Sequence, residues 1–339
     1  MKPMKLIKTA EAAGHILCHD MTEVVPGVSK GTRFRKGHIV QVSDIPILLD
    51  MGKEQLYVWQ QQPGMFHEEE GAERLCLLCR GEHVRAAPVR EGKIELFAER
   101  PGLLKIDSKK IAALNSIEGL AVITLKGNRG VKEGEKIAAL KIIPLLIEEE
   151  KLDRAAAAVG DLTVGEIAVS EKLINIIPYK HKKAGLIVTG SEIFNKRIKD
   201  SGSEILKKKI NVVNAECAET VVLPDQSNEI TAAILDMIKR GLDLVICTGG
   251  MSVDPDDKTV LAIRESGARI VSYGVPFMPG VMMLLSYFEK DGLSVPVIGA
   301  PACIFYEHTT ALDVLLPRLM ADDPISREDV ILLAEGGLS

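Results

Sequence analysis

The sequence predicts an α/β protein whose C-terminal part is a doubly wound, mostly parallel sheet, with an N-terminal α+β segment and a small, mostly β middle domain before it. Three observations support this fold class. Between residues 184 and 320, apolar runs of strand length alternate with helix-like runs, as in parallel sheets that helices cover on both faces. Between residues 84 and 147, short apolar runs are broken by turn residues, which favours antiparallel β structure. Within residues 1–60, a helix-like run precedes an alternating one.

The composition limits the class of protein. With 339 residues, 46% of them hydrophobic, the chain can bury enough apolar surface for two or three domains. Its 42 Lys and Arg residues against 47 Asp and Glu give a net charge of −5. Such a chain has no overall positive field for a polyanion, so we expect no nucleic-acid partner. The N-terminus lacks a signal-peptide core, and no apolar run approaches membrane-spanning length, so we expect a cytoplasmic protein without a membrane partner.

Residues 1–60 form the first predicted segment. Ser43 or Asp44 can cap a short helix, and Gly52 can end this helix in the left-handed conformation. The run QLYVW at 55–59 then alternates as a strand does. Together these signals indicate a helix-to-strand unit.

The second segment, residues 61–180, begins where a Pro/Gly turn leads into an acidic helix start, which suits the dipole at a helix N-terminus. The strand-like runs that follow predict a small barrel or sandwich with one helical stretch near residues 108–117. Cys76, Cys79 and His83 have a spacing that could offer metal ligands, but CLLC also fits an apolar helix face. We favour the helix face, because a structural zinc ion needs a fourth ligand nearby.

The third segment, residues 181–322, carries the predicted parallel sheet. Its strand-like runs lie at 184–190, 216–224, 242–250, 268–276 and 294–301. Helix-like runs separate or follow them at 201–213, 227–241, 256–267 and 305–321. Residues 323–339 are predicted to form a tail, or a strand that returns to another domain.

Ligands of open parallel sheets bind beyond the carboxyl ends of the strands, so the residues at those ends form the candidate site. We expect the following residues to bind substrate: Thr189, Gly190, Ser191 and Glu192 after the first strand, Thr248, Gly249, Gly250 and Ser252 after the third, and Gly299 and Pro301 after a later one. Gly249 and Gly250 allow positive φ angles that leave backbone amides pointing outward as an anion nest.

Carboxylates also stand at these strand ends, namely Asp225 after the second strand and Asp257 after the third. A carboxylate beside an anion requires a cation between them, so we predict Mg²⁺ held by Asp257 and Asp225. Capping of the next helix by Asp256 or Asp257 is the alternative. We favour capping for Asp256, and both interpretations stay open for Asp257.

The third segment resembles the molybdopterin-binding domain shared by MoeA-type molybdenumtransferases, MogA-type adenylyltransferases and CinA-type proteins. Four motifs carry the resemblance over residues 181–322: TGSEIFNKRIKDSGSEIL, VVLPDQSNEITAAI, LDLVICTGGMSVDPDDKT and VPVIGAPACIFYEHTTALDVLLPRL. The resemblance implies a MogA-like fold in which Asp257 and Asp225 are the catalytic and metal-binding residues. The run RKGHIVQVSDIPILLDMGKEQLYVW also looks like the N-terminal region of MoeA-type proteins.

This resemblance implies a transferase of molybdenum cofactor biosynthesis, which binds molybdopterin or its adenylylated form and assists molybdate insertion. It also implies a homo-oligomer, with a molybdoenzyme or another cofactor-assembly protein as partner. Two alternatives stay open. One is a non-catalytic carrier or sensor of molybdopterin. The other is a CinA-like nucleotide pyrophosphatase or amidase, because DPDDKT is closer to the P-D-D-x-T of CinA-type proteins.

Overall fold

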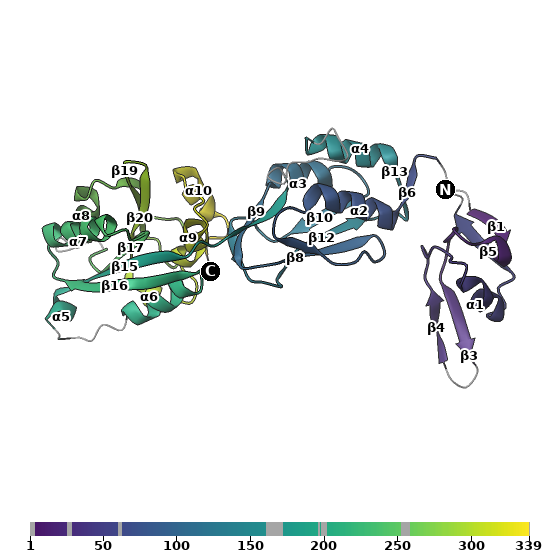
Figure 1. Ribbon diagram of the computed structural model, residues 1–339, viewed down its shortest axis with the longest axis horizontal. Helices are drawn as coiled ribbons and strands as arrows, with labels where there is room; N and C mark the ends of the chain where they lie inside the picture. Colours follow the sequence, from purple (N-terminus) through teal and green to yellow (C-terminus); the bar gives the residue numbers. More distant parts are fainter. Residues whose placement is uncertain are drawn as a thin grey trace.

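The computed structural model describes residues 4–25, 29–59, 63–160, 172–195, 197, 202–251 and 258–338. These residues form three domains in a row, with the middle domain between the N-terminal domain (purple) and the C-terminal domain (green to yellow) in Figure 1. Within these ranges, no helix has both the length and the apolar character that crossing a membrane requires.

The N-terminal domain holds a three-stranded antiparallel sheet, a hairpin and one helix. Its elements are β1 (Met4–Lys8), η1 (Thr9–Glu11), β2 (Ile16–Leu17), β3 (Met21–Val25), β4 (Ser29–Phe34), α1 (Asp44–Asp50) and β5 (Gln55–Trp59). The strand order in the sheet is β1-β5-β2, and β3 pairs with β4. Helix α1 begins after Ser43, the Asp44 carboxylate accepts a hydrogen bond from the Gln41 N–H at 2.8 Å, and Gly52 follows the helix with φ of +74°. The predicted helix-to-strand unit is therefore present.

The middle domain combines two antiparallel sheets and a short β pair with three helices. Its strands are β6 (Met65–His67), β7 (Val84–Ala86), β8 (Lys93–Ala98), β9 (Gly102–Ile106), β10 (Leu120–Thr124), β11 (Arg129–Val131), β12 (Lys136–Ile142), β13 (Leu146–Glu148) and β14 (Ile174–Pro178). Its helices are α2 (Glu68–Cys79), α3 (Ser108–Asn115) and α4 (Glu149–Ala158). The strand orders are β10-β12-β8-β7, β11-β9-β14 and β13-β6. The domain is thus more helical than the predicted mostly β domain, since α4 adds a helix that the sequence analysis does not predict.

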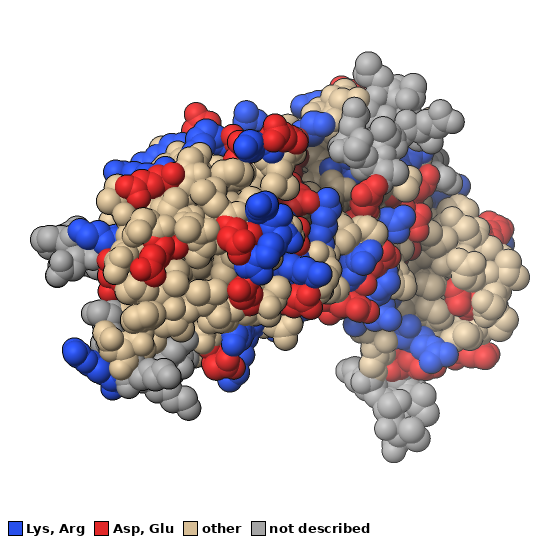
Figure 2. Space-filling view, turned by 60° about the vertical axis from the view of Figure 1, so that its left-hand side comes forward, with Lys and Arg blue, Asp and Glu red and all other residues tan. Residues whose placement is uncertain are grey.

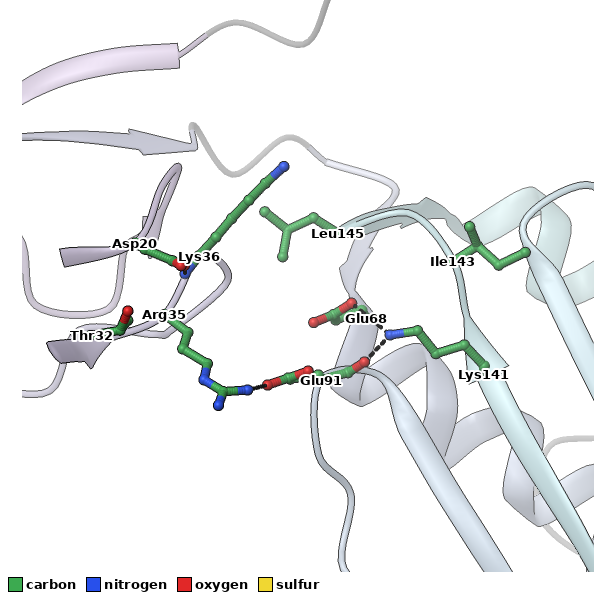
Figure 3. A pocket seen from close by; sticks show the side chains of 9 residues that line it. All are labelled: Asp20, Thr32, Arg35, Lys36, Glu68, Glu91, Lys141, Ile143 and Leu145. Atoms are coloured by element: carbon green, nitrogen blue, oxygen red, sulfur yellow. Dashed lines mark hydrogen bonds and ion pairs between the residues drawn. The ribbon is translucent and has the colours of Figure 1, made fainter. Parts of the chain in front are cut away.

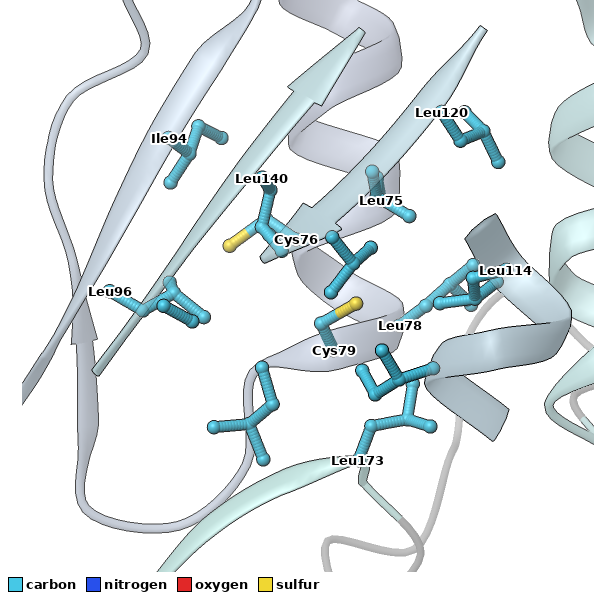
Figure 4. Close-up of a cluster of buried hydrophobic side chains, with 14 of the residues drawn as sticks. Leu75, Cys76, Leu78, Cys79, Ile94, Leu96, Leu114, Leu120, Leu140 and Leu173 are labelled. Atoms are coloured by element: carbon cyan, nitrogen blue, oxygen red, sulfur yellow. The ribbon is translucent and has the colours of Figure 1, made fainter. Parts of the chain in front are cut away.

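Helix α2 packs its apolar face into the core of the middle domain (Figure 4). Cys76 and Cys79 lie on this face, both buried and both reduced. Burial raises the pKa of the Cys79 thiol well above its usual range, so the thiol stays protonated and apolar. Among the described residues, no three His, Cys, Asp or Glu side chains come together to hold a metal ion. The interpretation of CLLC as a helix face agrees with this packing.

The C-terminal domain is built on a six-stranded sheet, and its mostly parallel character was predicted correctly. The strands are β15 (Lys182–Thr189), β16 (Ala215–Leu223), β17 (Leu244–Thr248), β18 (Arg269–Tyr273), β19 (Leu284–Lys290) and β20 (Leu293–Ala300). Their order is β16-β15-β17-β20-β19-β18. The first four strands of this order are parallel, whereas β19 is antiparallel to both β20 and β18.

Helices cover both faces of this sheet. They are α5 (Ser191–Phe194), α6 (Gly202–Asn211), α7 (Ser227–Lys239), α8 (Thr259–Glu265) and α9 (Ala311–Met320), together with the short helix η3 (Ala302–Phe305). Alternate residues of one strand enter two different cores: Leu186 packs with residues of α6 and α9, and Ile187 packs with residues of α7 and α8. Strands buried on both faces explain why their sequences are continuous apolar runs.

The last residues return to the C-terminal domain as helical turns, not as the predicted tail or strand. They form α10 (Arg327–Ile331) and η4 (Leu332–Ala334), and Ile325 and Val330 are buried in the core that also holds residues of α6 and α9. The segment also contacts the middle domain, because the Lys126 ammonium donates to the Glu335 carbonyl oxygen at 3.1 Å.

Candidate functional site

The order of the strands defines where a ligand can enter the C-terminal domain. From β15 the chain passes through α6 to β16 on one side, and then through α7 to β17 on the other side of β15. Helices α6 and α7 pack into the two opposite cores. The connections therefore diverge between β15 and β17. In open α/β sheets, a ligand-binding crevice lies outside the carboxyl ends of the strands at such a point. Of the residues predicted after the first and third strands of the sheet, the described ones, Thr189 to Glu192 and Thr248 to Gly250, stand at these strand ends.

At the crevice the ends of β15 and β17 meet through a glycine. A Cβ atom placed on Gly249 would lie 2.2 Å from the Thr189 carbonyl oxygen and 2.7 Å from the Thr189 hydroxyl, closer than any side chain can pack. Gly249 and Gly250 have φ angles of +89° and +55°, in the left-handed region that glycine adopts at no steric cost. The turn after β17 is thus a side-chain-free stretch of backbone, as the anion-nest prediction requires.

Buried threonine side chains pack against this glycine turn. The hydroxyls of Thr189 and Thr259 lie 3.3 Å apart, and both side chains are buried, as is that of Thr248. Thr259 begins α8, so this contact ties the end of β15 to the helix that follows the glycine turn. Thr189 and Thr248 are predicted substrate-binding residues, and the structure places their side chains in the supporting layer. No sequence pattern singles out Thr259 as a structural residue, although it is the threonine that ends DPDDKT.

Gly190 turns the chain directly after β15. Its φ angle is +142°, and its carbonyl oxygen accepts hydrogen bonds from the N–H groups of Ile193 and Phe194 at 3.1 and 2.9 Å. Ser191 and Glu192 form the first residues of α5, and their side chains lie outside the described part of the structure. The backbone of this turn reaches the same edge of the sheet as Gly249.

Gly299 and Pro301 lie at the end of β20 and are both buried. A Cβ atom on Gly299 would lie 2.5 Å from the terminal methyl group of Met251. The Met251 side chain, which follows the glycine turn, therefore packs over Gly299. The structure gives this strand end a packing role beneath the turn, and substrate binding by these two residues stays a prediction.

The predicted carboxylates can be placed only in part. Asp225 follows β16, the strand next to β15, in a turn where the Gln226 N–H donates to the Pro224 carbonyl oxygen at 2.8 Å. Ser252, Asp256 and Asp257 lie outside the described residues. Because no metal-binding group of His, Cys, Asp or Glu forms among the residues that are described, these residues alone do not make a Mg²⁺ site, and the metal stays a prediction.

A cavity of about 640 Å³ lies far from these strand ends, between the N-terminal and middle domains (Figure 3). Arg35 of the N-terminal domain pairs with Glu91, and the Lys141 ammonium lies 3.4 Å from a Glu68 carboxylate oxygen. Charges that neutralise one another leave little net attraction for an anion. Figure 2 likewise shows both signs of charge interspersed over one face of the molecule.

Comparison with known proteins identifies two regions of the chain. Residues 185–321 match the model of a family described as a probable molybdopterin binding domain. Residues 6–60 match a domain of unknown function. The resemblance of the third segment to the molybdopterin-binding domain family is therefore confirmed.

Curated relatives are similar to parts of the chain. A protein of Pyrobaculum arsenaticum is 29% identical over 150 residues, which are 40% of this chain and 56% of that protein. A CinA-like protein of Mycobacterium tuberculosis is 28% identical over 90 residues, which are 26% of this chain and 21% of the relative. The chain thus spans about half of the first relative and about a fifth of the second.

Solved structures are similar to the chain with low sequence identity and low TM-scores. The tungsten cofactor synthesizing protein MoaB of Pyrococcus furiosus is 15% identical with a TM-score of 0.30, and the match covers 47% of this chain and 98% of that one. A molybdenum cofactor biosynthesis protein of the same organism is 14% identical with a TM-score of 0.27, over 95% of this chain and 64% of that one.

Proposed function

We propose that this protein, whose residues 185–321 match the molybdopterin-binding domain family, binds molybdopterin or its adenylylated form at the carboxyl ends of β15 and β17. One observation carries the proposal: a half-buried glycine turn with positive φ angles follows β17 at the point where the connections of the sheet diverge. Crevices at such points are where open α/β sheets bind their ligands.

In this proposal, each described part of the site has a task. Backbone N–H groups of the turn at Gly249 and Gly250 donate hydrogen bonds to the phosphate of the ligand, since the backbone of a turn can gather successive N–H groups into an anion-binding concavity. The contact between the hydroxyls of Thr189 and Thr259 holds the end of β15 and the start of α8 together on the two sides of the turn. A turn that is held in place before the ligand arrives binds without a further loss of backbone entropy.

We further propose that the protein assists molybdate insertion, as a transferase of molybdenum cofactor biosynthesis in the cytoplasm. Asp257 and Asp225 are its proposed catalytic residues and Mg²⁺ ligands. Positioning and charge neutralisation can supply this catalysis without a covalent intermediate. We also propose a homo-oligomer, with a molybdoenzyme or another cofactor-assembly protein as its partner, which sedimentation of the purified protein and of its mixtures would test.

An activity assay tests insertion directly. Purified protein incubated with adenylylated molybdopterin, Mg²⁺ and molybdate should release AMP. No release at saturating ligand would remove the insertion proposal. Tight binding by calorimetry without AMP release would instead support a non-catalytic carrier or sensor, and absence of binding would overturn the molybdopterin site itself.

A second candidate function is nucleotide chemistry of the CinA-like kind. It is favoured by the CinA-like relatives, whose 28% identity extends over 90 residues, and by the threonine of DPDDKT, which the structure places against Thr189. Incubation with ADP-ribose and with nicotinamide mononucleotide would test the pyrophosphatase and the amidase separately. Turnover of either compound, without binding of molybdopterin, would favour this candidate over the first.

A further inference from the structure

The glycine turn after β17 lies against the segment that begins α8. A Cβ atom placed on Gly250 would lie 3.4 Å from the backbone nitrogen atoms of both Lys258 and Thr259, and 3.0 Å from the Thr259 hydroxyl. These distances bring the backbone of Lys258 directly beside Gly250. Lys258 therefore stands next to the stretch of backbone where the phosphate of the ligand is proposed to bind.

Lys258 and Thr259 differ in their exposure to solvent. Thr259 is fully buried, and its hydroxyl contacts that of Thr189. Lys258 is half-buried, so part of its side chain reaches the surface beside the turn. A lysine side chain is a flexible four-carbon stem that ends in a compact positive charge. This stem can place the ammonium group over the turn when an anion binds there.

Helix stability does not explain a lysine at this position. Lys258 is the N-cap residue of α8, but its side chain makes no capping hydrogen bond. The preferred N-cap residues are those whose side-chain oxygen accepts from the first N–H groups of the helix, whereas an ammonium group has no acceptor. A positive charge at the start of a helix also faces the positive end of the helix dipole. The charge of Lys258 is therefore unfavourable for α8 itself.

A positive charge beside the turn bears on the predicted Mg²⁺. The sequence predicts a cation because carboxylates and a phosphate meet at these strand ends, and a divalent metal ion is one such cation. An ammonium group is another, since lysine binds phosphate as a point charge in the phosphate loops of many nucleotide-binding proteins. Hydrogen bonds between charged groups are also stronger than those between neutral ones. Lys258 can thus neutralise a phosphate without a metal ion.

We propose that the Lys258 ammonium group binds the phosphate of the ligand at the glycine turn, so that the ligand binds without Mg²⁺. The phosphate accepts hydrogen bonds from the backbone N–H groups of Gly249 and Gly250 and from the Lys258 ammonium, and Mg²⁺ serves the insertion step alone. This inference rests on the function proposed above, because it concerns the same site and the same ligand.

Calorimetry of the full-length protein with molybdopterin tests whether binding needs the metal. The protein is titrated once in Mg²⁺ and once in EDTA, and the two dissociation constants should agree. Binding in Mg²⁺ that disappears in EDTA would overturn the inference and leave the proposed function intact. Binding in neither solution would overturn the proposed function, and the inference with it.

Variants then test the charge of Lys258. Lys258→Gln removes this charge and should raise the dissociation constant about tenfold, the scale of one lost charge-assisted hydrogen bond. It should also make binding less sensitive to salt, because one fewer attraction is screened. Lys258→Arg keeps the charge and should restore most of the affinity, a rescue that a purely structural role would not produce. The melting temperature should hardly change, since no capping hydrogen bond is lost.

Lys239→Gln is the matched control. It removes the same charge from an exposed lysine in the last turn of α7, the helix that leads to the start of β17, so the change lies at the opposite edge of the sheet. This variant should bind molybdopterin as the unchanged protein does. Equal affinities of Lys258→Gln and Lys239→Gln would overturn the proposal for Lys258, while binding by both would leave the molybdopterin site in place.

Discussion

Lys105 and Asp323 join the middle domain to the C-terminal segment: the Lys105 ammonium lies 3.0 and 3.2 Å from the two carboxylate oxygens of Asp323. The same carboxylate also pairs with Arg318, a buried residue of α9. Asp323 thus neutralises two cationic side chains, Lys105 and Arg318, which lie 213 residues apart in the sequence (318 − 105). Its loss should affect more than one contact.

The first prediction concerns this carboxylate. Asp323→Asn removes the charge that neutralises Lys105 and Arg318, and breaking a buried pair from one side costs about 3–5 kcal/mol. In the variant, Arg318 still has its second ion pair, with an Asp329 carboxylate oxygen 3.0 Å away. We therefore expect a loss at the lower end of this range, about 3 kcal/mol in the free energy of unfolding, measured in urea. Asp291→Asn is the control, because Asp291 is exposed in a turn with φ of +52°, which Asn tolerates. Equal stability of the two variants would contradict the prediction.

The second prediction concerns acid stability. Partial burial alone would raise the pKa of Asp329, but hydrogen bonds from Ser326 and Arg318 outweigh burial and hold its pKa below the ordinary value of 3.8. Such a group stabilises the folded state fully above its unfolded pKa, and this contribution is lost as the pH falls through the lower folded pKa. Melting temperature should therefore decline below about pH 4, and Asp329→Asn should reduce the decline. An identical acid profile for the variant would exclude Asp329 as a contributor.

The third prediction concerns the proposed catalytic carboxylate. If Asp257 contacts metal or substrate, Asp257→Asn should lower activity by a factor on the order of 100, the scale of a lost electrostatic contact in a catalytic site. The melting temperature should hardly move, because Asn caps helices about as well as Asp does. Asp256→Asn should leave both quantities nearly unchanged. Full turnover and metal dependence in Asp257→Asn would reduce Asp257 to a helix cap and move the catalytic assignment to Asp225.

The fourth prediction concerns the glycine at the crevice. Gly249→Ala places a Cβ atom 2.2 Å from the Thr189 carbonyl oxygen, so it adds overpacking to the cost of a left-handed alanine. We expect a loss above about 2 kcal/mol in the free energy of unfolding and weaker binding of molybdopterin. Gly241→Ala is matched in φ, at +85°, but its Cβ meets nothing within 4 Å, so only the conformational cost of about 1–2 kcal/mol applies. If both variants lose the same stability, the contact with Thr189 is not tight.

The parallel sheet could be predicted from sequence because its strands carry the signal in themselves. Leu186 and Ile187, neighbours on β15, enter cores on opposite faces, so the strand has no polar face and stands out as a continuous apolar run. Helix α4 carries no comparable signal. Its buried residues are Leu152 and Ala155, and a face made of one leucine and small alanines is hard to distinguish from a polar loop.

The sequence also predicts a location for the candidate site, since ligands bind at the carboxyl ends of parallel strands, and this location stays a prediction. The role of each side chain could not be predicted. The contact between the hydroxyls of Thr189 and Thr259 joins residues 70 positions apart, and the packing of Met251 over Gly299 depends on the neighbouring strand. Such contacts are set by tertiary structure, which no local pattern of residues encodes.

The helical turns after residue 322 affect how the region that matches the molybdopterin-binding domain family can be expressed as a separate fragment. Ile325 and Val330 are almost fully buried, at 3% and 0% exposure, among the apolar side chains of that region. A fragment trimmed to the matched residues, 185–321, would leave two apolar gaps open to water. A fragment that starts before β15 and extends to residue 338 keeps its core closed, and is the one to express when the region is studied in isolation.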